Sequence, residues 1–295
     1  MFSELFELPS RTLFSRGKNL KLSQPILMGI LNATQDSFSD GQSFLEFDDA
    51  LVRARKIIAE GADWLDIGGE ASGPNSNEVT SEEELRRVIP IIKAVRSESD
   101  IWISVDTWKA EVARHSLDAG ADAINDVSGL RADKDMARVI AEFQVPLILM
   151  YSKDSTPRTT REFTQYRDVM ESIISFFSEQ IEYAQSNGIQ KSQIIVDPGM
   201  GLFISGNAKY SFELVRRISE LHEFNLPLIL GPSRKSFLAA VSSGRILNYS
   251  ERDFPCALVS SIALWQGVSI LRLHEVDQGR LLIDTFEKIK KTSTN

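Results

Sequence analysis

Residues 25–32 read PILMGILN, an apolar run that ends in a polar amide. The run over 26–31 has the length of a strand and contains no polar residue, which is typical of a strand buried on both faces. A segment of helical period follows over 48–60, and its apolar residues fall on one helix face: Ala50, Leu51, Ala54, Ile57 and Ile58. A buried strand followed by an amphipathic helix is the repeating unit of α/β proteins with a parallel sheet.

The same strand–helix unit recurs to the end of the chain. Ser81, with Glu84 three residues later, fits a capping box at the start of the second helix. The predicted strands cover 26–31, 64–67, 101–105, 121–124, 146–150, 193–196, 226–230 and 269–273. The predicted helices cover 48–60, 81–96, 109–118, 134–143, 167–186, 210–224, 235–242 with a second helix at 254–265, and 277–290.

Eight strand–helix units within about 270 residues predict an α/β fold of the (β/α)8 TIM barrel type. A doubly wound open sheet is the alternative. Its dinucleotide-binding form would carry a G-x-G-x-x-G turn after a strand, and the sequence has no such turn. No linker divides the chain, so we expect a single domain over 1–295 in which residues 1–22 form an N-terminal extension.

Composition and charge narrow the possible partners. Hydrophobic residues make up 42% and charged residues 25%, as in an average globular protein. The formal net charge of −8 argues against a general nucleic-acid or anionic-membrane surface, although it leaves room for local anion sites. The single cysteine, Cys256, cannot form an intramolecular disulfide, and no apolar run reaches the roughly 18 residues of a membrane span. We expect a cytoplasmic protein with no membrane or nucleic-acid partner.

Polar residues follow seven of the eight predicted strands. In a TIM barrel, active-site groups gather where strands end and the following loops begin. Each of these residues taken alone also fits a helix cap or a turn. The strand-end residues are Asn32, Asp66, Asp106, Asn125, Asp126, Asp197, Ser233, Arg234, Lys235, Arg272 and His274.

Three of the strand-end residues suit a planar heterocycle. Asp106, Asn125 and Asp197 offer acceptors and an amide donor for a ring edge that carries amino and N–H groups. Carboxylates that converge beside Lys235 and Arg272 are costly to bury unless they bind something. The set therefore favours a binding site over a collection of unrelated caps.

Other strand-end residues suit an anion and a cation. Arg272 and His274, with the hydroxyls of loop 31–41, could hold a phosphate or pyrophosphate. Asn32 offers an oxygen to Mg²⁺, which usually keeps waters and substrate phosphates as its other ligands. His274 could instead be a structural histidine bonded to a backbone carbonyl.

Seven segments resemble the dihydropteroate synthase family of the folate pathway. They occur in the family's order, and the resemblance covers the chain from residue 13 to residue 290. The segments are MGILNATQDSFSDG (28–41), DIGGEASGP (66–74), SVDTWKAEVA (104–113), AINDVSG (123–129), VDPGMG (196–201), SRKSF (233–237) and LRLH (271–274).

The resemblance implies a TIM barrel that joins 6-hydroxymethyl-7,8-dihydropterin pyrophosphate to p-aminobenzoate by an SN1-like route, with Mg²⁺ as cofactor. The implied pterin residues are Asp106, Asn125, Asp197 and Lys235. The implied pyrophosphate residues are Asn32, Thr34, Ser72, Arg272 and His274, and Asn32 would also be the metal ligand. The implied p-aminobenzoate residues are Phe38, Pro74, Leu202, Ser233 and Arg234. The implied catalytic residues are Asp106, Lys235, Asp36 and Arg272.

The chain departs from the family pattern in two loops. The first loop of the family reads N-V-T-P-D-S-F-S-D-G-G, and here Ala33, Gln35 and Gln42 replace its valine, proline and last glycine. The second loop commonly reads G-E-S-T-R-P, whereas residues 69–74 read GEASGP and lack the arginine. Lys153 or Arg158 are cations that could substitute for it. The missing arginine motivates a second hypothesis, a catalytically weak pterin-binding paralogue; a pterin-binding methyltransferase is a third.

The segment after the sixth strand has its own departure. Residues 197–206, DPGMGLFISG, resemble the sulfonamide-resistant branch of the family, in which consecutive phenylalanines are common and Leu202 replaces the first. Tyr151 stands where a histidine is common. We hypothesise an altered sulfonamide sensitivity. The family also implies a homodimer built through the late helices.

Overall fold

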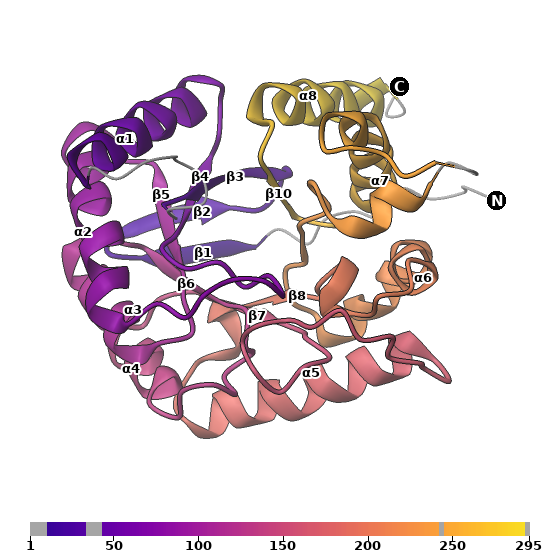
Figure 1. The fold of residues 1–295 in the computed structure, drawn as a ribbon, viewed down its shortest axis with the longest axis horizontal. Helices are drawn as coiled ribbons and strands as arrows, with labels where there is room; N and C mark the ends of the chain where they lie inside the picture. Colours follow the sequence, from indigo (N-terminus) through magenta and orange to yellow (C-terminus); the bar gives the residue numbers. More distant parts are fainter. Residues whose placement is uncertain (1–10, 34–42, 242–244, 293–295) are drawn as a thin grey trace.

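The computed structural model describes residues 11–33, 43–241 and 245–292, and in it helices form a ring around a central barrel of strands (Figure 1). The barrel strands are β3 (Ile26–Asn32), β4 (Trp64–Gly68), β5 (Trp102–Asp106), β6 (Ala123–Asp126), β7 (Leu147–Met150), β8 (Ile194–Asp197), β9 (Ile229–Leu230) and β10 (Ile270–Leu273). The α-helices in the described residues are α1 (Ser43–Ala59), α2 (Ser81–Glu98), α3 (Ala110–Ala119), α4 (Met136–Phe143), α5 (Val169–Ser186), α6 (Lys209–Arg217), α7 (Asp253–Trp265) and α8 (Val276–Thr292).

The eight strands form one parallel sheet in the order β8-β7-β6-β5-β4-β3-β10-β9. A parallel bridge between Val196 and Leu228 links β8 and β9, the two edge strands of this sheet, and nearly closes the barrel. The α/β TIM barrel predicted from the sequence is therefore confirmed. None of the helices in the described ranges combines the length and apolarity needed to span a bilayer.

The chain before the barrel forms an antiparallel hairpin of β1 (Thr12–Ser15) and β2 (Lys18–Lys21). Arg16 and Gly17 make its turn, and both have positive φ angles, of 52° and 76°. Two side chains from this part of the chain, Leu13 in β1 and Leu22 directly after β2, pack against the apolar interior of the barrel. They join the cluster that contains Ile26, Met28, Trp64, Trp102, Ala123, Ile148, Ile195, Ile229 and Ile270. Within the predicted extension 1–22, residues 1–10 lie outside the described part of the chain.

Several predicted element boundaries differ from the structure. The cap of α2 is Thr80 rather than Ser81, because Thr80 has an extended backbone and its Oγ1 accepts from the N–H of Glu83. Glu84 does not complete a capping box; its carboxylate accepts from Lys109 Nζ. The predicted helix over 210–224 is α6 followed by a 3₁₀ helix, Ile218–Phe224, and the one over 235–242 is a 3₁₀ helix, Ser236–Ala240.

Candidate active site

A pocket opens at the C-terminal ends of the strands. It gathers the four predicted pterin residues with Ser72 and Arg272, for which the resemblance implies a role in pyrophosphate binding. The lining residues are Ser72, Asp106, Asn125, Val127, Met150, Asp197, Gly199, Met200, Phe203, Gly231, Lys235 and Arg272. The residues that sequence reasoning missed are mainly apolar, because a wall made of Val127, Met150, Met200 and Phe203 carries no chemical signal in sequence.

Arg272 links two carboxylates beneath the pocket. Its Nε donates to Asp66 Oδ2 at 2.6 Å, and its Nη2 donates to Asp106 Oδ2 at 2.7 Å. Burial opposes the charge on Arg272, but the two carboxylates outweigh burial and raise its pKa. Burial also raises the pKa of Asp106, against the attraction of Arg272. Arg272 is thus engaged by the protein before any substrate arrives.

Only one of the two polar atoms of the Asn125 side-chain amide has a hydrogen-bond partner among the described residues. Its Nδ2 donates to Asp66 Oδ2 at 3.1 Å, while its buried Oδ1 has no hydrogen-bond partner among the described residues. An unpaired buried acceptor is costly, so a ligand with an N–H donor would stabilise it. The neighbouring Asp126 accepts from the N–H groups of Ser128 and Leu130, so this strand-end residue closes a turn.

Asp197, the last residue of β8, and Lys235, in the loop after β9, also line the pocket. Asp197 Oδ1 accepts from the N–H of Gly199 at 2.8 Å, and burial nevertheless raises the Asp197 pKa. Lys235 Nζ lies 4.6 Å from the centre of the Phe203 ring. Burial first, and then the charge of Arg272, lowers the pKa of Lys235 to about 8. The ammonium of Lys235 is therefore held in a site where a hydrogen-bond acceptor from a ligand would stabilise it.

His274 directly follows β10, the strand that carries Arg272, and its Nδ1 lies 2.9 Å from Ser233 Oγ. Burial and then the cations Arg234, Arg272 and Lys235 lower the pKa of His274 to about 3, so the ring is neutral at pH 7. Because Ser233 Oγ also accepts from the His274 backbone N–H, we assign the hydroxyl proton to Nδ1 and the ring N–H to Nε2. The partner of His274 Nδ1 is thus a side-chain hydroxyl rather than a backbone carbonyl.

The predicted metal ligand ends a barrel strand at the rim. Asn32 is exposed and pairs in register with Gly68. Within the described ranges, no group of three or more His, Cys, Asp or Glu side chains is placed to hold a metal ion. Asn32 fits Mg²⁺ only in the form in which water and substrate phosphates supply most ligands.

Of the p-aminobenzoate residues predicted from the resemblance, the four that lie in the described ranges are not among the residues that line this pocket: Pro74, Leu202, Ser233 and Arg234. Leu202 sits in a 3₁₀ helix, Gly201–Phe203, and Pro74 is exposed on the loop after β4. Arg234 forms an ion pair with Glu275 and has a φ angle of 60°. Ser233 contacts His274, as described above. The remaining predicted first-loop residues, Thr34, Asp36 and Phe38, lie outside the described residues.

Comparison with known proteins agrees with this geometry. The family model described as "Pterin binding enzyme" matches residues 28–274. A dihydropteroate synthase of Escherichia coli (strain K12) is 41% identical over 268 residues, which cover 90% of this chain and 92% of the relative. The chain belongs to the dihydropteroate synthase family. A Synechocystis dihydropteroate synthase is 40% identical over 270 residues, covering 90% of this chain and 89% of that protein.

Solved dihydropteroate synthases share the fold. The Xanthomonas albilineans enzyme with 4-aminobenzoic acid has a TM-score of 0.87 at 34% identity, covering 95% of this chain and 98% of that chain. The Yersinia pestis enzyme in a sulfonamide drug complex has a TM-score of 0.86 at 36% identity, covering 95% and 99%. Membership of the dihydropteroate synthase family, implied by the sequence motifs, is confirmed.

Proposed function

We propose that this dihydropteroate synthase joins 6-hydroxymethyl-7,8-dihydropterin pyrophosphate to p-aminobenzoate and releases pyrophosphate. The observation that supports this reaction most directly is the pocket in which Asp106, Asn125, Asp197 and Lys235 converge beside an apolar wall. A pterin ring presents amino and N–H donors at one edge and acceptors at another. The unpaired Oδ1 of Asn125 and the Asp197 carboxylate suit the donors, and the Lys235 ammonium suits an acceptor.

The residues suit an SN1-like reaction. The C–O bond to pyrophosphate breaks with its electron pair leaving on oxygen, and the amine nitrogen of p-aminobenzoate then forms a C–N bond and loses a proton. The cation formed on the pterin methylene lies in a site that holds the carboxylates of Asp106 and Asp197. Such a route needs positioning and electrostatic stabilisation and no protein nucleophile.

The leaving pyrophosphate requires donors and cations. Arg272, the Nε2–H of His274 and the Ser72 hydroxyl would supply them, and Asn32 would hold Mg²⁺ at the rim. When bound, Mg²⁺ would neutralise charge on the phosphates. A neutral His274 acts here as a hydrogen-bond donor rather than as a cation, which follows from its lowered pKa.

One assay distinguishes the proposed reaction from the alternative function, a catalytically weak pterin-binding paralogue. Purified protein is incubated with pterin pyrophosphate, Mg²⁺ and p-aminobenzoate, and both pyrophosphate release and dihydropteroate are followed. The expected result is equal formation of the two products. Pterin binding without product would instead support the catalytically weak paralogue that the missing second-loop arginine suggests.

The Lys235 pKa of about 8 gives a pH dependence. Only protonated Lys235 offers a charged donor and leaves no lone pair facing the ligand acceptor, so kcat/KM for pterin pyrophosphate should fall as pH rises through about 8, by tenfold per unit above it. Arginine stays charged in this pH range, so the fall in kcat/KM near pH 8 should be absent from the profile of Lys235→Arg, whatever the level of activity of that variant. The two pH profiles, measured with the same substrate, also separate the titration of Lys235 from that of the pterin. An identical step in both would contradict the role of Lys235.

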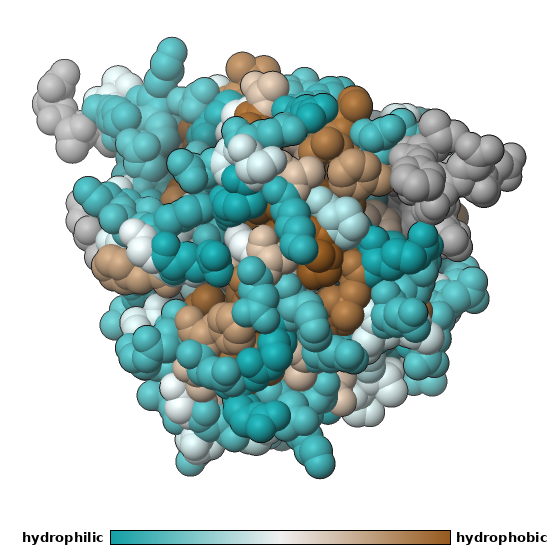
Figure 2. All heavy atoms as spheres, turned by 90° about the vertical axis from the view of Figure 1, so that its left-hand side faces the viewer, coloured by the Kyte–Doolittle hydropathy of each residue, from teal (hydrophilic) through white to brown (hydrophobic). Residues whose placement is uncertain are grey.

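We also propose a cytoplasmic homodimer. Exposed apolar side chains gather on the late helices: α7 carries Phe254, which is 81% exposed, and Leu258, which is 56% exposed, while α8 carries Leu281, which is 68% exposed. By contrast, hydrophilic side chains cover most of the face that carries α1 to α4, with smaller apolar areas between them (Figure 2). Exposed apolar patches of this kind mark interfaces, and a second copy of the chain would cover the patch symmetrically.

Replacing Leu258 with glutamate should convert the dimer to a monomer, because the charge would be buried without a partner. Sedimentation velocity measures the change in mass. Val52→Glu is the matched control, since Val52 is equally apolar and exposed but lies on α1. A monomeric wild-type protein, or a Leu258→Glu protein that stays dimeric, would argue against this surface.

A further inference from the structure

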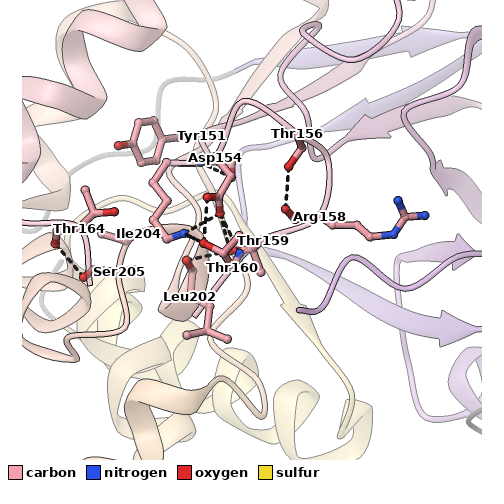
Figure 3. A network of polar contacts seen from close by, with 12 residues as sticks. Tyr151, Asp154, Thr156, Arg158, Thr159, Thr160, Thr164, Leu202, Ile204 and Ser205 are labelled. Atoms are coloured by element: carbon pink, nitrogen blue, oxygen red, sulfur yellow. Dashed lines mark hydrogen bonds and ion pairs between the residues drawn. The ribbon is translucent and has the colours of Figure 1, made fainter. Parts of the chain in front are cut away.

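Residues 151–166, which lie between β7 and α5, run along the loop that follows β8 (Figure 3). We call these residues the bridging segment. It bonds to residues 202–206 at successive positions: Lys153 N–H donates to Phe203 O at 2.8 Å, Thr159 Oγ1 to Leu202 O at 2.9 Å, Tyr166 Oη to Ile204 O at 2.6 Å, Ser205 Oγ to Thr164 O at 2.8 Å, and Gly206 N–H to Glu162 O at 3.0 Å. Phe203, in the middle of this loop, lines the pocket.

The bridging segment also contacts a second loop, the one that follows β4. The Thr159 N–H donates to the carbonyl oxygen of Ser72 at 3.1 Å. Arg158 forms an ion pair with the buried carboxylate of Glu70, which also accepts from Lys109. Figure 3 shows the Arg158 side chain extending away from the Thr159 cluster. Residues 158 and 159 therefore join the loop that carries Ser72 to the loop that carries Phe203.

The bridging segment is itself held firmly. Asp154 accepts from Lys153 Nζ at 2.6 Å and from the Thr160 N–H at 2.9 Å. Arg131 Nη2 donates to the carbonyl oxygens of Ser152 and Asp154 at 2.9 and 2.8 Å. Thr159 Oγ1 also lies 3.0 Å from Asp154 Oδ2, but the hydroxyl has one proton to donate. Because Asp154 Oδ2 already accepts from Lys153 Nζ and the Thr160 N–H, we assign that proton to the bond with Leu202 O. A rigid segment of this kind can fix the loops that it contacts.

We infer that Thr159 is a positioning residue for p-aminobenzoate, a role that rests on the proposed function. Its hydroxyl holds the backbone next to Phe203, and its N–H holds the backbone of Ser72; both of these residues line the pocket. The pterin is assigned mainly to strand-end residues, among them Asp106 and Asn125, which the barrel fixes without help from the bridging segment. The second substrate, by contrast, must enter between loops, so it depends on the spacing that Thr159 sets.

The test is Thr159→Val, which keeps the side-chain shape and the backbone N–H but removes the hydroxyl. We expect the KM for p-aminobenzoate to rise by about threefold to tenfold, as for the loss of one net hydrogen bond. The KM for pterin pyrophosphate should change by less than about twofold, because the barrel fixes the strand-end pterin residues and Thr159→Val keeps the N–H that holds Ser72, the proposed pyrophosphate donor. Thr159→Ser restores the hydroxyl and should return the KM for p-aminobenzoate towards the wild-type value. A general structural defect would move both KM values and would not be rescued in this selective way.

Thr156→Val is the matched control, because the hydrogen bond of the Thr156 hydroxyl among the described residues stays within the bridging segment, to the carbonyl oxygen of Arg158 at 3.0 Å. Equal KM values in the Thr156 and Thr159 variants would overturn the inference, as would a Thr159→Val protein that raises both KM values together. If Thr159→Val does not fold, Thr159→Ala removes the same hydroxyl with a smaller side chain and should give the same selective rise; its absence is then decisive. A wild-type protein without synthase activity would instead refute the proposed function.

Discussion

Arg272→Met is expected to lower the free energy of unfolding by about 3 to 5 kcal/mol, the usual result of removing one partner of a buried ion pair. Asp66 is completely buried, and Arg272 is the cation that it contacts. Ser104 and Asn125 also donate to its carboxylate, but neither neutralises its charge. Methionine fills much of the arginine volume, so most of the loss should come from the uncompensated charge. Denaturant unfolding followed by circular dichroism measures the change.

A second substitution tests this explanation. Asp66→Asn in the Arg272→Met background removes the stranded charge, so the double variant should be more stable than the single one. Arg55→Met is the control, because Arg55 forms a bidentate ion pair with Glu98 at the exposed surface. The loss of this surface ion pair should change the free energy of unfolding little. If Arg272→Met and Arg55→Met unfold alike, or if Asp66→Asn gives no recovery, the buried pair does not stabilise the barrel as described.

Asp106→Asn should lower kcat/KM by about a thousandfold while the protein stays folded. The substitution keeps the size of the side chain but removes the carboxylate that faces the pocket and would stabilise the cationic pterin. Stability should largely persist, because Arg272 keeps its contact with Asp66. Steady-state kinetics with pterin pyrophosphate and p-aminobenzoate gives the change in kcat/KM, and circular dichroism checks the fold.

Asp118→Asn is the matched control for Asp106→Asn, since Asp118 is an exposed aspartate at the end of α3 and should leave activity unchanged. Activity of Asp106→Asn within about tenfold of the wild type would remove Asp106 from the catalytic set. A large loss accompanied by unfolding would leave stability as the cause, and this is why both measurements are made on the same samples.

Much of the barrel could be predicted from the sequence, because a parallel strand buried on both faces is an apolar run and its covering helix has a clear period. The strand predicted over 226–230 is shorter in the structure, Ile229–Leu230. Pro227 has no N–H to donate to a neighbouring strand, which limits the ladder. The hairpin at 12–21 was missed because Leu13 and Leu20 are separated by charged and polar residues rather than set in an apolar run.

The candidate site was predicted in part for a similar reason. Polar residues at strand ends stand out in sequence, so Asp106, Asn125, Asp197 and Lys235 could be named. The contact between Asp66 and Arg272 could not, because it joins residues 206 positions apart and depends on the closure of the barrel. The pairing of Arg158 with Glu70 likewise follows from how two loops meet. The altered sulfonamide sensitivity and the magnesium ion stay predictions.

The hairpin of β1 and β2 has a consequence for how this protein can change in evolution. Leu13 and Leu22 pack onto the barrel interior at the end opposite the pocket, so one mouth is sealed by chain and the other is open to substrates. Mutations at the closed end can therefore change the stability of the fold without changing which substrates are converted. Mutations around the pocket can change the binding of substrates and drugs without changing the packing at the closed end. Selection for drug tolerance and selection for stability can thus act on separate sets of residues.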